Sequence, residues 1–279
     1  MNRREFFRTG GAVCALPAAS RADALRAAVR ITGLETDLLR FPPNRGIEPA
    51  GVVLRLQTDA GITGWAYTPF DEMRRGPGLM RTILERDIAP VLLDRDPAFP
   101  KRLHVAIWKA VAHRGDQDTG QHAIAAADIA LWDILGKAAG LPVYKILGAC
   151  ADRIPAYSMC GRYHENDRDL GQLRRAVAAA CEEGFQAIKI QVGRGPLDDD
   201  VRRINVARQV VGRERGIMVN AHQAFHLEEA IRRGRVYQQM GCYWYEVPLP
   251  PYDHAAYADL ARELDIPVAS GENEYTKHL

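Results

Sequence analysis

The chain has 279 residues, a formal net charge of +2, and a composition that is 47% hydrophobic and 26% charged. These proportions are typical of a folded globular protein and exclude an intrinsically disordered chain. The small net charge argues against nucleic-acid binding, and no apolar run is long enough to span a membrane. We therefore expect a protein that acts on a small molecule.

Residues 1–24 have the features of an export signal. Arg3 and Arg4 are followed by Phe6 after one residue, then by a mildly apolar stretch over 9–19 and the small-residue sequence ADA at 22–24. A charged region, an apolar region and an A-x-A cleavage site predict a twin-arginine signal peptide. We expect a periplasmic or other extracytoplasmic location, and the alternative is a basic terminus with no targeting role.

Residues 25–150 are predicted to form an α+β domain. Strand patterns cover 29–39, 52–57 and 62–67, and a D-A-G turn joins the last two into a hairpin. Helical periodicity follows over 79–93, 99–112 and 121–139. The third helix should end at Gly140, since Pro142 lies just beyond it.

Residues 151–279 change to regular alternation of short apolar strands and helices. The predicted strands are 154–160, 187–192, 217–221, 243–247 and 266–270, and the predicted helices are 169–183, 199–211, 227–240 and 255–264. Such alternation predicts βαβ units and a parallel sheet. The fold class is therefore α/β, with an α+β domain followed by an incomplete TIM-like barrel of about five strands and four helices, because a closed barrel of this kind has eight strands.

Polar residues follow or end the second to fifth of these strands at a nearly constant interval. Gln191, Asn220, Glu246 and Glu272 are separated by 29, 26 and 26 residues, or one βα unit each. The carboxyl ends of parallel strands meet on one face, where barrel active sites are built. Amide and carboxylate oxygens from three successive strands, namely Asn220, Glu246 and Glu272, predict a site for a hard cation such as magnesium. Taken singly, each would more often be a solvated loop residue, and the prediction depends on the three occurring at a constant interval.

A lysine interrupts the second of these strands. Lys189 stands between Ile188 and Ile190, where a charge without a partner is costly. We expect its side chain to point into the barrel mouth beside the predicted metal ligands. The alternative is an internal ion pair with a purely structural role.

Five sequence stretches resemble one known family. They are AIAAADIALWDILGK at 123–137 with LPVYKILG at 141–148, GFQAIKIQVG at 184–193, IMVNAHQ at 217–223, WYEVP at 244–248 and VASGEN at 268–273. Their order and spacing are similar to those of the mandelate racemase and muconate lactonizing enzyme family of the enolase superfamily. The resemblance runs from about residue 29 to the end of the chain.

The resemblance implies a capping domain over 25–150, a modified barrel over 151–279, and a small carboxylate substrate whose α-proton is removed. Mg²⁺ held by Asn220, Glu246 and Glu272 would stabilise the enediolate, with Lys189 beside the substrate carboxylate. His222 matches the D-x-H arrangement of some sugar-acid dehydratases, in which the histidine is the general acid. This favours dehydration of a sugar acid or another hydroxy acid over racemisation or epimerisation, whereas a structural role in capping the next helix is the alternative for His222.

Three departures from the family pattern favour a different interpretation. Asn220 stands where the family has Asp, which removes one negative charge and should weaken magnesium binding. Gln191 stands where the family often has a lysine base, and an amide accepts no proton at neutral pH. The predicted barrel also has only five strands. The alternative is therefore a truncated, non-catalytic homologue that binds carboxylates or a partner; a complete barrel would instead imply a homo-oligomeric enzyme.

Overall fold

A computed structural model describes residues 29–40, 50–70, 77–112, 119–164, 167 and 169–275. The predicted signal peptide, 1–24, lies outside the described residues. The chain divides into two compact units, Met1–Asp152 and Arg153–Leu279, and the boundary predicted after residue 150 lies two residues earlier. Among the described residues, no helix is long and apolar enough to cross a membrane.

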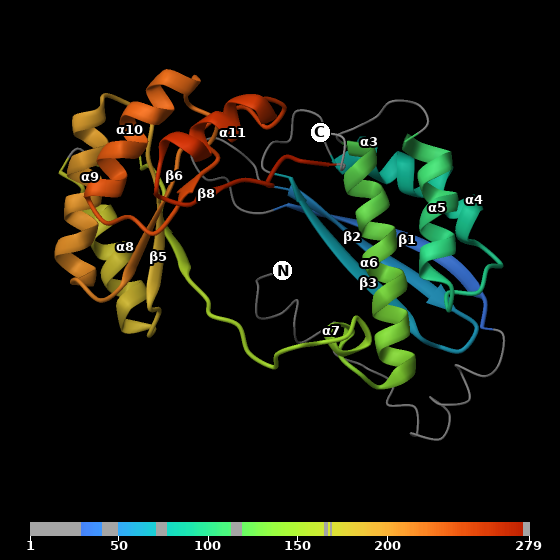
Figure 1. The fold of residues 1–279 in the computed structure, drawn as a ribbon. Helices are drawn as coiled ribbons and strands as arrows, with labels where there is room; N and C mark the ends of the chain where they lie inside the picture. Colours follow the sequence, from blue (N-terminus) through green and yellow to red (C-terminus); the bar gives the residue numbers. More distant parts are fainter. Residues whose placement is uncertain are drawn as a thin grey trace. The chain divides into compact units, whose positions relative to one another are not determined.

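The first unit contains a three-stranded antiparallel sheet in the order β1-β2-β3 (Figure 1). Its strands are β1 (Ile31–Arg40), β2 (Ala50–Thr58) and β3 (Thr63–Phe70), which confirms the three predicted strands. The turn between β2 and β3 is closed by a hydrogen bond from the Thr58 N–H to the Ile62 carbonyl, 3.1 Å long. Gly61 has a φ of +69° there, a conformation that favours glycine.

Helices pack on this sheet and form the core of the first unit. They are α3 (Pro77–Thr82), the π-helical turn η1 (Ile83–Ile88), α4 (Ala89–Leu92), α5 (Pro100–Val111), α6 (Thr119–Ala139) and α7 (Val143–Ile146). Contact between α6 and β3 is close, because a Cβ on Gly64 would lie 2.2 Å from the Ala130 carbonyl oxygen. Gly64 thus allows the helix to approach the strand.

The prediction of one regular helix over 79–93 is wrong, because this segment consists of α3, η1 and α4 in succession. It is interrupted by η1, and the Ala89 N–H donates to the carbonyl of Leu84, five residues back, instead of four. Pro90 comes next and has no N–H to continue the α-helical pattern. A wider π turn before the proline accommodates the missing donor.

The second unit is a five-stranded parallel sheet in chain order with four helices (Figure 1). The strands are β4 (Ser158–Gly161), β5 (Ala187–Gln191), β6 (Gly216–Asn220), β7 (Tyr245–Glu246) and β8 (Val268–Ala269). The helices are α8 (Gly171–Glu182), α9 (Leu197–Val211), α10 (Leu227–Gln239) and α11 (His254–Glu263). The predicted strand–helix alternation and parallel pairing are confirmed. Within the described residues β4 and β8 are the sheet's two edges, so this part of the chain forms an open sheet.

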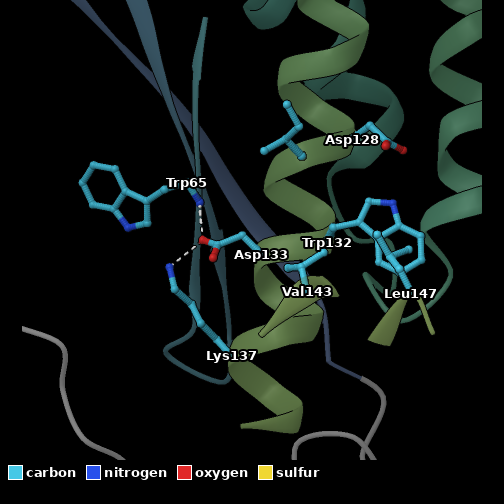
Figure 2. Close-up of a pocket in the computed structure, with 8 residues that line it drawn as sticks. Trp65, Asp128, Trp132, Asp133, Lys137, Val143 and Leu147 are labelled. Carbon is cyan, nitrogen blue, oxygen red and sulfur yellow. Dashed lines mark hydrogen bonds and ion pairs between the residues drawn. The ribbon is translucent and has the colours of Figure 1, made fainter. Parts of the chain in front are cut away.

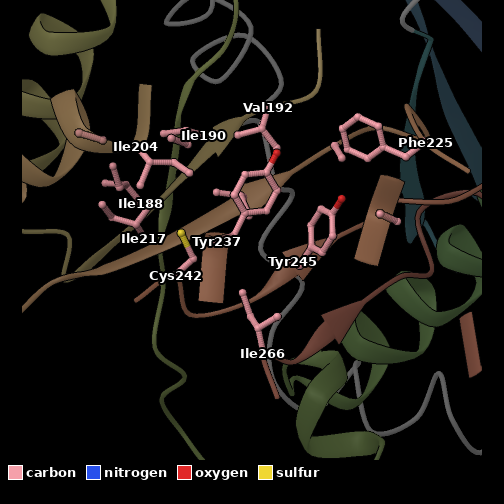
Figure 3. Packing of buried hydrophobic residues seen from close by; sticks show 14 of the residues in the cluster. Ile188, Ile190, Val192, Ile204, Ile217, Phe225, Tyr237, Cys242, Tyr245 and Ile266 are labelled. Atoms are coloured by element: carbon pink, nitrogen blue, oxygen red, sulfur yellow. The ribbon is translucent and has the colours of Figure 1, made fainter. Parts of the chain in front are cut away.

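One face of this sheet is covered by all four helices. Figure 3 shows Ile188, Ile204 and Ile217 packed beside Tyr237, whose ring meets the ring of Tyr245 edge-on at 5.2 Å between centroids. Side chains alternate between the two faces of a strand. Ile188 and Ile190 of β5 face the helices, so Lys189 and Gln191 project from the opposite face of the sheet. In β7, Tyr245 faces the helices and Glu246 projects from the opposite face.

Candidate active site at the carboxyl ends of the parallel strands

Three of the predicted site residues end neighbouring strands. Gln191, Asn220 and Glu246 are the last residues of β5, β6 and β7, and the strand register pairs Gln191 with Asn220 and Asn220 with Glu246. They therefore form one row across the end of the sheet. Glu272 lies farther out, three residues beyond the end of β8 at Ala269, which pairs with Glu246.

The Glu246 carboxylate is the centre of this row, and three side chains donate to it. The Lys189 ammonium donates a hydrogen bond to Oε1, and the side-chain amide of Asn220 donates one to the same oxygen over 2.8 Å. Trp244 donates its indole N–H to Oε2 over 2.9 Å. The Glu246 side chain is only 12% exposed, so these donors replace most of the water that the carboxylate would otherwise bind.

Lys189 is held as a buried ammonium. Only 8% of the residue is exposed, and its Nζ also lies over the ring of Tyr157, 5.3 Å from the centroid. Burial by itself lowers the pKa of Lys189, but the hydrogen bond and charge of Glu246, together with Tyr157, more than offset this and raise the pKa above its usual value. The structure thus gives Lys189 the ion-pair partner that its apolar surroundings require.

Asn220 is fixed at both ends of its side chain. Its Oδ1 accepts the backbone N–H of His222 over 2.8 Å, which turns the amide nitrogen toward Glu246. His222 and Gln223 have positive φ values of 54° and 65°, an uncommon conformation for residues other than glycine. Such local conformations recur at functional sites.

His222 extends from this turn toward the loop after β8. Its Nδ1 lies 3.7 Å from Oε2 of Glu272, and both side chains are about half exposed, at 56% and 45%. The N-cap residue of α10 is His226, whose side chain makes no capping hydrogen bond. The described contact of the His222 ring is with Glu272, not with the start of α10.

Gln191 contributes to the architecture of the strand ends. Its Oε1 accepts the backbone N–H of Tyr163 over 3.1 Å, which ties the end of β5 to the loop after β4. Arg203 of α9 donates to the carbonyls of Gln191 and Gly161, at 3.0 and 2.8 Å. These bonds hold the carboxyl ends of β4 and β5 together.

A second buried ionic cluster, which the sequence analysis missed, lies beside these loops. Asp200 of α9 is fully buried and accepts hydrogen bonds from the guanidinium of Arg233, the Tyr237 hydroxyl at 2.6 Å and the Gly193 N–H at 2.8 Å. The signal was present, because Asp200 precedes Ile204, Ala207 and Val211 of the same buried helical stripe. Asp200 is the last of three consecutive aspartates at 198–200, so the sequence does not distinguish the buried one from its exposed neighbours.

The donor set at the strand ends fits a hard cation in kind. Asn220 Oδ1 and the carboxylates of Glu246 and Glu272 are the oxygen ligands that magnesium prefers, and they carry two negative charges. Within the described part of the chain no group of three or more His, Cys, Asp or Glu side chains could hold a metal ion. Glu246 and Glu272 supply only two carboxylates, so the candidate set of three ligands depends on the side-chain amide of Asn220.

The first unit has its own groove of about 580 Å³. Its lining residues include none of the predicted site residues; they are Trp65, Asp128, Ile129, Trp132, Asp133, Lys137, Val143 and Leu147 (Figure 2). Asp133 accepts hydrogen bonds from the backbone N–H of Trp65 at 2.8 Å and from the Lys137 ammonium at 2.6 Å. Lys137 also donates to the Thr63 carbonyl. These hydrogen bonds connect α6 to β3 beside the groove.

Sequence comparison identifies both units. Residues 47–148 match the mandelate racemase / muconate lactonizing enzyme N-terminal domain, and residues 172–278 match the enolase C-terminal domain-like family. This is the architecture of a capping domain followed by a barrel-type domain. The chain belongs to the mandelate racemase/muconate lactonizing enzyme family of the enolase superfamily.

Individual relatives include enzymes that act on acid sugars. Arabinonate dehydratase of Saccharolobus solfataricus is 33% identical over 230 residues, which is 81% of this chain and 60% of the relative. The 3,6-anhydro-alpha-L-galactonate cycloisomerase of Streptomyces coelicolor is 29% identical, over 88% of this chain and 69% of the relative. The structure of L-talarate dehydratase from Polaromonas sp. JS666, complexed with Mg and L-glucarate, has a TM-score of 0.78 and 31% identity, over 88% of this chain and 66% of that one. The chain therefore spans about three fifths of the first relative's length.

Proposed function

We propose that the protein removes the α-proton of a sugar acid with the help of Mg²⁺ and then eliminates the β-hydroxyl, which makes it an acid-sugar dehydratase. The observation that carries this proposal is the hydrogen-bonded cluster of Lys189 on β5 with Asn220 and Glu246, which end the neighbouring parallel strands β6 and β7. Relatives that are acid-sugar dehydratases, one of them with bound Mg, support it.

We assign each site residue one role in this reaction. The side chains of Asn220, Glu246 and Glu272 would hold the metal, which when bound would polarise the substrate carboxylate and make the α-proton easier to remove. Lys189 supplies a positive charge next to that carboxylate. Gln191 braces the strand ends, and the base that accepts the α-proton is a different residue, because an amide accepts no proton near neutral pH.

His222 is the proposed general acid. Its imidazole is half exposed beside the strand ends, and its Nδ1 lies 3.7 Å from Oε2 of Glu272, so it is within reach of a bound substrate as a proton donor. The proton passes to the β-hydroxyl as the C–O bond breaks, so the hydroxyl leaves as water. Racemisation or epimerisation needs no such donor to a leaving group, and His222 therefore favours dehydration.

The test is exchange and elimination measured together. L-Glucarate and arabinonate are incubated with the protein and Mg²⁺ in deuterated water, and ¹H NMR follows loss of the α-proton signal and formation of product. We expect exchange and elimination with at least one acid. His222→Asn should retain exchange and lose elimination by about 100-fold or more, whereas His226→Asn, an exposed histidine four residues away, serves as the matched control.

A non-catalytic carboxylate-binding role is the second candidate. The amides at 191 and 220 favour it, because both replace charged side chains of the family pattern, and Lys189 already neutralises Glu246. Saturable binding of the same acids by calorimetry, without exchange under any metal condition, would favour this role over catalysis.

The location of the protein is a separate proposal from its sequence. We propose that residues 1–24 direct export through the twin-arginine route. Changing Arg3 and Arg4 together to lysine should then keep the protein in the cytoplasm, as cell fractionation would detect. Lys substitution at Arg8, outside the pair, is the control.

A further inference from the structure

We propose that Lys189 and the amide of Asn220 act as a built-in cation for Glu246, so that Mg²⁺ competes with them for one carboxylate oxygen and its binding releases Lys189. This inference concerns how the site is regulated and rests on the proposed magnesium-assisted function.

The competition follows from the bonding of Glu246 Oε1. A carboxylate oxygen offers about two lone-pair positions. On Oε1 the ammonium of Lys189 takes one and the Asn220 amide, at 2.8 Å, takes the other, while Trp244 binds Oε2. A cation that binds Oε1 has to displace one of these donors.

The orientation of Asn220 determines whether Glu246 needs a metal. Turning the amide over would bring its oxygen against the Glu246 carboxylate and its nitrogen against the His222 N–H, so both existing hydrogen bonds would become repulsive contacts. An aspartate at 220 would place a negative oxygen in the position that now donates to Glu246. With Asp the pair of carboxylates requires a cation, whereas with Asn the protein supplies the donor itself.

Lys189 is the donor that can leave. Lysine is a point charge on a flexible stem, unlike the planar and rigidly oriented guanidinium of arginine. The ring of Tyr157, 5.3 Å from Nζ, provides an attractive surface for the ammonium when it moves away from Glu246. The released ammonium therefore remains in the site, where it can meet a substrate carboxylate.

Magnesium binding to the wild type and two variants tests this competition. Calorimetry measures the Kd of the wild type, Asn220→Asp and Lys189→Met for Mg²⁺, and thermal unfolding is followed in EDTA and in MgCl₂. Adding a negative charge at 220 or removing the competing cation at 189 should each tighten Mg²⁺ binding by about tenfold or more. Asn220→Asp should also lower the Tm in EDTA by about 4 °C and recover it in MgCl₂.

The controls separate the site from a general charge effect. Asn205→Asp makes the same charge change on the exposed surface of α9 and should leave the Kd unchanged. If Lys189→Met lowers the Tm below the working temperature, Lys189→Gln tests the same loss of charge with a polar side chain.

The outcomes distinguish this inference from the proposed function. Equal magnesium affinities in the wild type, Asn220→Asp and Lys189→Met would overturn the competition, whatever the exchange assay reports. Tighter binding in both variants, together with no α-proton exchange by the wild type, would support the built-in cation and reject the dehydratase proposal.

Discussion

Two buried carboxylates in the second unit, Asp200 and Glu246, are neutralised in different ways. Asp200 is fully buried and faces an arginine, a tyrosine hydroxyl and a backbone N–H. Glu246 is slightly exposed and faces a lysine, an amide and an indole. Both satisfy the requirement that a buried charge be paired and hydrogen-bonded.

The difference separates a cluster that is enclosed by the fold from one that borders solvent. Arg233 is permanently charged, and its guanidinium also donates to the Gly195 carbonyl at 3.0 Å, so it closes the space between α9, α10 and the loop after β5. Lys189 carries its charge on a flexible stem, and Asn220, which shares Glu246 with it, accepts the backbone N–H of the half-exposed His222. The enclosed cluster of Arg233 and Asp200, which we call the closed cluster, connects the loop after β5 to α9 and α10. The Lys189–Glu246 pair is less enclosed and lies near the carboxyl ends of the strands.

Breaking the closed cluster should have the largest effect on stability. Asp200→Asn leaves Arg233 buried without its full counter-charge, and we expect a loss of about 3–5 kcal/mol in unfolding free energy, measured by urea denaturation. The adjacent Asp199→Asn is the control, because Asp199 is 53% exposed in a 3.6 Å pair with Arg202 and should change stability by less than about 1 kcal/mol. Equal losses in the two variants would contradict the distinction between the clusters.

A pair of donor deletions sharpens the same comparison. Tyr237→Phe removes the hydroxyl that donates to Asp200 at 2.6 Å and retains the ring against Tyr245. We expect a loss of about 2 kcal/mol, the usual cost of a buried hydrogen bond to a charged group. Trp244→Phe removes the donor to Glu246 Oε2 and should cost about 1 kcal/mol, because water reaches the partly exposed site. A larger loss for Trp244→Phe, by urea denaturation, would reverse the assignment of the structural cluster.

The strand order of the second unit could be predicted because its signals are local. Short β-branched runs between helical patterns define the strands, and the constant spacing of Asn220, Glu246 and Glu272 indicates that they follow successive parallel strands. The bonding of these residues could not be predicted. Whether Asn220 turns its oxygen or its nitrogen toward Glu246 depends on the His222 N–H, which is positioned by a turn with positive φ.

Other features depend on contacts between distant segments. Asp200 and Arg233 are 33 residues apart, and only the packing of α9 beside α10 brings them together. The π turn before Pro90 has a local cause, yet a proline can equally end a helix, so the sequence alone leaves both outcomes open. Long-range pairing and backbone accommodation therefore mark the limit of sequence reasoning in this chain.

The smallest predicted effect is the pH dependence of Glu229, at the outer edge of the closed cluster. Hydrogen bonds from Arg232 and Arg233 lower the pKa of Glu229 to about 2. A lowered pKa stabilises the folded state above the unfolded-state pKa of about 4.3, and this contribution is lost as the pH falls through about 2. Because the side chain is 34% exposed, solvent screening limits the contribution to less than about 1 kcal/mol.

Urea unfolding of Glu229→Gln and wild type at pH 7, 4.5 and 2.5 measures this contribution. The wild type should be slightly more stable at pH 7, and its advantage should shrink between pH 4.5 and 2.5, where Glu229 becomes protonated in the unfolded state but is still mostly ionised in the folded state. Glu228→Gln is the control, since Glu228 forms no ion pair among the described residues and should change little. An advantage as large at pH 2.5 as at pH 7 would mean that Glu229 acts by packing instead of charge, and Asp200 alone would then be the charge partner that holds Arg233 in place.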